Sequence, residues 1–214
     1  MLELEGIRYR VAGSPADLLA GVNLALRPGV PALVAGRSGS GKTTLLEVIS
    51  GLARPTAGSV RWKGEVVSDR QRRWLCGLVF QFPERHFLGL SVGQELRLGH
   101  RRVPGERLEA VLARVGLAGL SLQQAPERLS GGQQRRLALA VQLLRDPGVL
   151  LLDEPTAGLD WSVRGEVLEL IRSVSSDRAL LVVTHEPDLF EDLVGERWRL
   201  EAGHLETAQA LIAP

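Results

Sequence analysis

The 214-residue sequence has a single cysteine, Cys76, and a net charge of only +1. One cysteine excludes an intrachain disulfide and a cysteine-based metal site, so we expect Cys76 to be a small buried residue in a reducing compartment. The weak charge gives no sign of a nucleic-acid partner, and we interpret the basic residues Arg70, Arg72 and Arg73 as a solvated face. No apolar run is long enough to cross a bilayer and the first residues do not resemble an export signal, so we predict a cytoplasmic chain.

A glycine-rich run between an apolar strand pattern and a helix pattern is the strongest feature that is present. It matches the phosphate-loop pattern G-x-x-x-x-G-K-[ST] and comprises Gly36, Arg37, Ser38, Gly39, Ser40, Gly41, Lys42 and Thr43, followed by Thr44. The glycines let backbone N–H groups point at phosphate oxygens, and a following helix adds its positive end. Lys42 suits the β- and γ-phosphates, and the Thr43 hydroxyl suits a magnesium ion. This run predicts a nucleoside triphosphate site, with ATP and Mg²⁺ as ligands.

Strand and helix patterns alternate along most of the chain. We expect strands at 2–11, 22–26, 31–35, 59–63, 75–80, 149–152 and 179–184, and helices from 44, at 134–145, at 163–174 and after Pro187. Residues 83–129 read as polar helical segments without a strand. The pattern predicts one α/β domain over 1–214. Residues 1–82 and 130–214 form a mainly parallel core with a small antiparallel β layer, and 83–129 form an inserted helical lobe.

Two adjacent acids end the buried strand at 149–152. Asp153 and Glu154 leave the sheet at its carboxyl edge, and neighbouring strand positions face opposite ways. We therefore assign Asp153 to magnesium and Glu154 to the general base that activates water.

A second glycine-rich turn precedes the helix expected at 134–145. Ser130 is a candidate N-cap, and Gly131 and Gly132 leave N–H groups uncovered, so this turn is a second candidate anion site. On its own it is equally well read as a flexible capped turn.

The order and spacing of these motifs resemble those of the ATP-binding subunits of ABC transporters, and the resemblance extends from residue 2 to about 205. In that family Leu129-Ser130-Gly131-Gly132-Gln133 is the signature sequence, Asp153 and Glu154 belong to the Walker B motif, and Asp160 falls in the D-loop. Gln81 resembles the Q-loop glutamine, a magnesium ligand and sensor, and His185 resembles the switch histidine that contacts the γ-phosphate. The resemblance implies an ATPase that works as a head-to-tail pair, a homodimer or heterodimer. In such a pair the signature of one chain closes over the ATP held by the other, and Asp160 contacts the partner, although Asp160 also suits a helix N-cap.

The resemblance leaves the adenine contact open. Family members usually place a stacking aromatic near the end of the first strand, where this chain has Val11, with Tyr9 two residues earlier on the same strand face. Either residue is a candidate, and an aliphatic contact predicts weaker preference for ATP over GTP.

The biological task is suggested by a short sequence. Gln81-Phe82-Pro83-Glu84 is similar to a run in the ATPases of energy-coupling factor and cobalt-type importers, which implies uptake of a vitamin or metal ion through separate integral membrane subunits. Those ATPases commonly have a further C-terminal region, whereas this sequence ends soon after Glu206, so the resemblance leaves the mode of dimer contact open. The alternative is a soluble ABC-type ATPase for assembly or remodelling, such as iron–sulfur assembly. A nucleotide kinase would leave the signature sequence unexplained.

Overall fold

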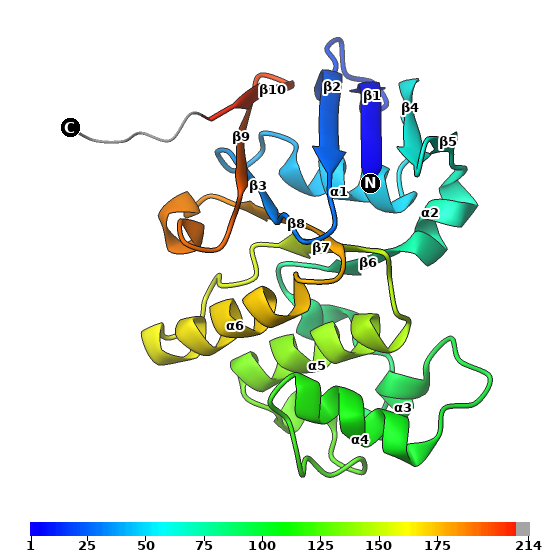
Figure 1. Ribbon diagram of the computed structural model, residues 1–214, viewed down its shortest axis with the longest axis vertical. Coiled ribbons are helices and arrows are strands. Elements are labelled where there is room, and N and C mark those ends of the chain that lie inside the picture. The colour runs from blue at the N-terminus through cyan, green and yellow to red at the C-terminus, as the bar shows by residue number, and fades with distance from the viewer. Residues whose placement is uncertain (209–214) are drawn as a thin grey trace.

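A six-stranded sheet forms the centre of the computed structural model, which describes residues 1–208 (Figure 1). Its strand order is β10-β9-β3-β8-β7-β6, and the neighbouring strands from β9 to β6 all pair in parallel. The strands are β3 (Ala32–Ala35), β6 (Cys76–Val79), β7 (Val149–Asp153), β8 (Ala179–Thr184), β9 (Glu196–Glu201) and β10 (His204–Thr207). Parallel strands bring their carboxyl ends to one edge, where ligands of such sheets usually bind.

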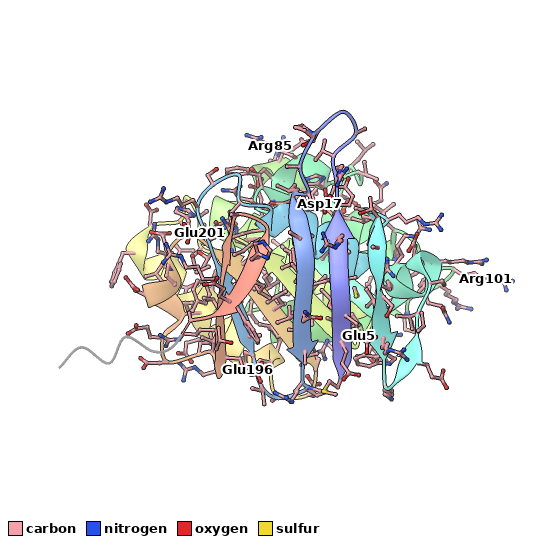
Figure 2. The ribbon with its side chains drawn as sticks, turned by 90° about the horizontal axis from the view of Figure 1, so that it is seen from above. Glu5, Asp17, Arg85, Arg101, Glu196 and Glu201 are labelled. Atoms are coloured by element: carbon pink, nitrogen blue, oxygen red, sulfur yellow. The ribbon has the colours of Figure 1, made fainter. Side chains whose placement is uncertain are left out.

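A four-stranded antiparallel sheet lies over one face of this centre. Its order is β2-β1-β4-β5, and the strands are β1 (Leu2–Tyr9), β2 (Leu19–Leu26), β4 (Ala57–Trp62) and β5 (Glu65–Val66). Figure 2 looks onto this layer, with Glu5 on β1 and Asp17 on the loop that leads into β2. The predicted antiparallel layer is therefore present.

The central strands are apolar on both faces because each face covers a separate core. Along β7, Leu150 and Leu152 pack into one cluster with the helices below the sheet, while Val149 and Leu151 pack into the other with α1 and the antiparallel layer. This alternation explains why 149–152 is apolar at every position rather than at every second one.

The helices occupy two regions of the molecule. The first, α1 (Lys42–Ser50), lies between the two sheets, while α5 (Gly131–Leu144) and α6 (Trp161–Val174) lie below the central sheet (Figure 1). The segment expected to form the lobe contains short helices only: η1 (Pro83–His86), α3 (Val92–Arg97), α4 (Gly105–Arg114) and η2 (Pro126–Arg128). Buried residues of α3 and α4 join the lower cluster, so this segment packs on α5 rather than standing apart.

The sequence-based prediction missed one helix. Residues 69–75 form α2 (Asp69–Leu75), where Ser68 and Gln71 cap each other's backbone. The interpretation of Arg72 as solvated was wrong: its side chain is 4% exposed and pairs with Asp69 at 2.8 Å. The pattern Ser-x-x-Gln at 68–71 was the available signal for this helix start.

Several strand predictions also need correction. The first strand ends at Tyr9, so Val11 lies beyond it, and the hairpin of β9 and β10 was not predicted. A 3-10 helix, η3 (Pro187–Phe190), follows the switch region as expected. Among residues 1–208, every helix is too short or too polar to cross a membrane.

Candidate active site

The phosphate loop connects β3 to α1 in the predicted way, with the helix beginning at Lys42 rather than at Thr44. Gly39 and Gly41 have φ values of 80° and 100°, which other residues rarely adopt. At Gly36 an added Cβ would lie 2.6 Å from Oγ of Ser40 and 2.8 Å from the Leu200 carbonyl, so only glycine fits. The loop is built for close backbone approach to a ligand.

A cleft of about 460 Å³ opens at this loop. It has the size of a small-molecule site. Ten of the residues that the sequence marked for chemistry line it, joined by Leu18: Ser38, Gly39, Gly41, Lys42, Thr43, Thr44, Gln81, Asp153, Glu154 and His185. Motifs from four separate parts of the chain therefore meet at the carboxyl edge of β3, β6, β7 and β8.

Lys42 lies at the base of the cleft with little exposure. Its Nζ donates hydrogen bonds to the carbonyls of Gly36 at 2.7 Å and Arg37 at 3.1 Å, and it lies 3.7 Å from Oε1 of Glu154. This amine is the fixed positive charge that a polyphosphate requires.

The Asp153 carboxylate contacts the hydroxyl of Thr43, the second residue of α1. Thr43 Oγ1 donates a hydrogen bond to Asp153 Oδ2 at 2.7 Å. Burial raises the pKa of the Asp153 carboxyl, the negative charge of Glu154 acts in the same direction, and the Thr43 hydrogen bond opposes both. A buried carboxylate beside a hydroxyl fits Mg²⁺, which prefers oxygen ligands. Residues 1–208 contain no cluster of three or more His, Cys, Asp or Glu side chains able to hold a metal. A magnesium ion here would thus complete its shell with phosphate oxygens and water.

Glu154 is held by contacts on both carboxylate oxygens. Oε2 accepts hydrogen bonds from Thr184 Oγ1 at 2.8 Å and from the His185 backbone at 3.2 Å, while Oε1 lies 2.8 Å from His185 Nδ1. Glu154 and His185 are therefore in direct contact through both the side chain and the backbone of the histidine. Thr184, fully buried, is a further residue of the site that sequence reasoning missed, because only the fold brings it to Glu154.

Asp153 and Glu154 do not face opposite sides of a strand, so the reason for giving them different roles was wrong. Glu154 lies beyond the end of β7 with φ of 46°, so strand alternation does not set its direction. Asp153 and Glu154 line the same cleft, and their different neighbours, Thr43 for one and Thr184 with His185 for the other, separate their environments.

The second glycine-rich turn lies elsewhere. Ser130 caps α5 as expected, since its Oγ accepts from the Gln133 backbone at 3.3 Å and Gln133 Oε1 accepts from the Ser130 backbone at 2.9 Å. Among the described residues, the lining of the cleft does not include Ser130, Gly131, Gly132 or Gln133. Within one chain the two predicted anion sites are therefore not joined.

The remaining predicted residues also lie outside this lining. Three loop residues, Gly36, Arg37 and Ser40, do not line the cleft, and neither do Val11 and Tyr9. Val11 is 47% exposed, while Tyr9 is partly buried against the core that lies between the central sheet and the antiparallel layer, here called the upper core. Asp160 is exposed at the N-cap position of α6, but its side chain makes no capping hydrogen bond, which removes the capping explanation.

A larger groove of about 710 Å³ lies between β1, β2 and β9, with Glu5 and Glu196 on its two sides (Figure 2). It contains no part of the phosphate loop, so we place the active site in the smaller cleft, where the chemistry-bearing side chains meet.

The fold and cleft define a P-loop nucleoside triphosphatase. The family model described as ABC transporter matches residues 19–157. The chain belongs to the ABC transporter family and is an ATP-binding, ATP-hydrolysing subunit, as the sequence resemblance predicted.

Similar proteins agree with this assignment. ABC transporter I family member 11, chloroplastic, of Arabidopsis thaliana is 40% identical, with 97% of this chain and 81% of that protein covered. Energy-coupling factor transporter ATP-binding protein EcfA2 of Lactococcus lactis is 36% identical, covering 96% and 77%. Lipoprotein-releasing system ATP-binding protein LolD of Pseudomonas syringae is 38% identical, covering 95% of each. The structure of cbiO1 from Clostridium perfringens, part of the ABC transporter complex cbiONQ, has a TM-score of 0.85 at 26% identity, covering 96% of this chain and 86% of that one.

Proposed function

We propose that this subunit powers uptake of a vitamin or a transition-metal ion by ATP-driven pairing with a second ABC ATPase subunit. The observation that carries the proposal is the separation of the two predicted anion-binding turns: the phosphate loop lines the cleft, whereas the signature turn at Ser130 does not contribute to its lining. A head-to-tail pair supplies the missing half, because each chain then offers its signature to the other chain's ATP. The pair is a homodimer or a heterodimer with a related ATPase.

In the proposed reaction the phosphate loop and Lys42 hold the triphosphate. Mg²⁺, held by Thr43 and Asp153 with Gln81 nearby, would supply positive charge to the phosphate oxygens. Glu154 takes a proton from the attacking water, and its contacts with Thr184 and His185 orient the carboxylate for this task. The exposed ring of His185 contacts the γ-phosphate through its other nitrogen.

The choice of substrate rests on two supports. One is the run Gln81-Phe82-Pro83-Glu84, and the other is the presence of energy-coupling factor ATPases among the relatives. Relatives also include ATPases named for lipoprotein release and for L-cystine transport, so direct uptake measurements must decide.

We further propose that the chain works at the cytoplasmic face of a membrane and that the loop after Gln81 docks on membrane subunits. Leu88 and Leu90 are 80% and 82% exposed there. Hydrogen bonds hold the backbone of this loop in place, because the buried Glu95 carboxylate accepts from the N–H groups of Leu88 at 2.9 Å and Gly89 at 2.7 Å. Rigid exposed leucines suit an apolar partner surface.

Mixed subunits test the paired site. Ser130→Arg should spare ATP binding and stop hydrolysis, whereas Lys42→Ala should weaken binding itself. The two variants are given different affinity tags and mixed, so that the mixed pair can be purified. In that pair the Ser130→Arg chain offers a working phosphate loop and the Lys42→Ala chain offers an intact signature, so one complete hybrid site forms. Hydrolysis by the purified mixed pair, above that of either variant alone, is the expected result. Normal hydrolysis by Ser130→Arg alone would contradict the paired site.

Membrane association is tested by co-purification from detergent-solubilised membranes. The chain should recover integral membrane proteins, and Leu88→Asp with Leu90→Asp should lose them while retaining the ATPase activity of the isolated chain. Recovery of soluble partners alone would instead support the assembly ATPase.

A further inference from the structure

Arg135 lies one turn into α5, close behind the signature turn, and is only 8% exposed. Its hydrogen-bond acceptors are all backbone carbonyls rather than carboxylates. Nη1 donates to the carbonyls of Glu154 at 3.1 Å and Pro155 at 2.8 Å, and Nη2 donates to the carbonyl of Gln81 at 3.0 Å. One guanidinium therefore joins three pieces of the proposed machinery: the signature helix, the end of β7 and the segment after β6.

The position of Arg135 is costly for a charged side chain. Burial lowers the pKa of the Arg135 guanidinium, and the negative charge of Glu84 acts in the opposite direction. An arginine still remains protonated inside a protein, so the charge has to be accommodated by its neighbours. Because taking a charged group out of water costs free energy, simple stability is a weak reason for an arginine here.

The backbone at Glu154 explains what this side chain supplies. Glu154 has φ of 46°, a left-handed conformation that is strained for a residue with a side chain and persists only where its surroundings enforce it. Its N–H donates to the Val183 carbonyl at 2.9 Å, and its own carbonyl accepts from Arg135. The two contacts fix the peptide on both sides of the carboxylate-bearing residue.

The planar fork of arginine suits this geometry. Its two terminal nitrogens reach the Gln81 carbonyl on one side and the Glu154 and Pro155 carbonyls on the other at the same time. A lysine has a single nitrogen on a flexible stem and would hold one side at a time.

We propose that Arg135 is a positioning residue that fixes Gln81 and Glu154 relative to the signature turn of the same chain. The inference rests on the proposed function, since the roles of Gln81, Glu154 and the signature belong to it. In the proposed pair, Gln81 and Glu154 serve the chain's own ATP while the signature serves the partner's. Arg135 is then a direct physical link between the two ATP sites.

The test compares Arg135→Gln and Arg135→Lys with Arg107→Gln in the full chain. Arg107, an exposed arginine, is the control for an arginine-to-carbonyl hydrogen bond on the same helix, because it donates to the Leu144 carbonyl at 2.8 Å at the opposite end of α5, away from the cleft. For each variant the measurements are kcat, KM for ATP and the thermal unfolding midpoint.

Arg135→Gln should lower kcat about 10- to 100-fold, the value of hydrogen bonds to a charged group, and leave KM within about twofold because Lys42 is untouched. Arg135→Lys should recover part of the loss, and Arg107→Gln should keep kcat even where it lowers the unfolding midpoint. If Arg135→Gln does not fold, the expected result is a reduced kcat for Arg135→Lys at an unfolding midpoint matching that of Arg107→Gln.

Unchanged kcat in both Arg135 variants, or losses equal to that of Arg107→Gln, would overturn the inference. A separate measurement isolates the proposed function: if Glu154→Gln turns over normally, the assigned chemistry fails. If Glu154→Gln is slow while Arg135→Gln behaves like Arg107→Gln, only the positioning role fails.

Discussion

His185 Nδ1 lies 2.8 Å from Oε1 of Glu154, although the two residues come from the ends of different strands. The contact leaves the other ring nitrogen available for a ligand. It also fixes one oxygen of Glu154 while Thr184 fixes the other.

Replacing Glu154 by glutamine should separate ATP binding from hydrolysis. The amide retains the size of the side chain but cannot accept a proton from water, so we expect turnover to fall about 10²- to 10⁴-fold. ATP affinity should remain, and an ATP-bound pair should accumulate on size-exclusion chromatography. Turnover near that of the unmodified chain would refute the general-base role.

Thr184 offers an isosteric test of how Glu154 is held. Thr184→Val removes the hydroxyl that donates to Oε2 at 2.8 Å, while Thr184→Ser keeps it. A hydrogen bond to a charged group is worth about 1.5–3 kcal/mol, so kcat of the valine variant should fall at least about tenfold. The serine variant should stay close to the unmodified chain. Equal kcat values for the two variants would show that the hydroxyl has no part in catalysis.

Buried strands and sequence motifs were predictable because local sequence specifies them. The apolar run at 149–152 must be covered on both faces, and the phosphate loop requires glycine at fixed positions. Strand β9 escaped prediction because only Leu200 in it is buried and Trp198 is its one other apolar residue, so the apolar alternation is too short to indicate a strand. Its hairpin turn at Ala202 and Gly203 has two positive φ values, but alanine is not a typical residue for such a turn.

Residues that act through tertiary contacts could not be found in this way. Thr184 is an ordinary strand residue until β8 is placed beside β7. Arg135 is one of two adjacent arginines, and the sequence does not distinguish it from Arg136, which instead pairs with Glu166 at 3.2 Å. Only the packing of α5 against the central sheet shows which of them faces the site.

The adenine contact yields a prediction about nucleotide preference. Val11 is exposed beyond β1, and the aliphatic Leu18 is the nearby side chain that lines the cleft. Val11→Tyr should supply a stacking ring worth about 1 kcal/mol, or roughly fivefold tighter ATP binding, and should raise the preference for ATP over GTP. Tyr9→Phe, a change in the upper core, should alter neither quantity. Both affinities can be measured by isothermal titration calorimetry, and unchanged ATP affinity in Val11→Tyr would place the base elsewhere.

Cys76 provides a probe of the upper core that is independent of nucleotide. Burial raises the pKa of its thiol from 9.0 to about 12, and the residue is 3% exposed. The folded chain therefore keeps its proton at pH values where the unfolded chain has lost it. The contribution of this group to stability is complete below pH 9 and is lost progressively as the pH rises toward 12. The thiol should be inert to aromatic disulfide reagents at pH 8 until urea unfolds the chain. The urea midpoint should fall between pH 9 and 10 more steeply than in a Cys76→Ala control, and equal slopes would show that the thiol titrates normally.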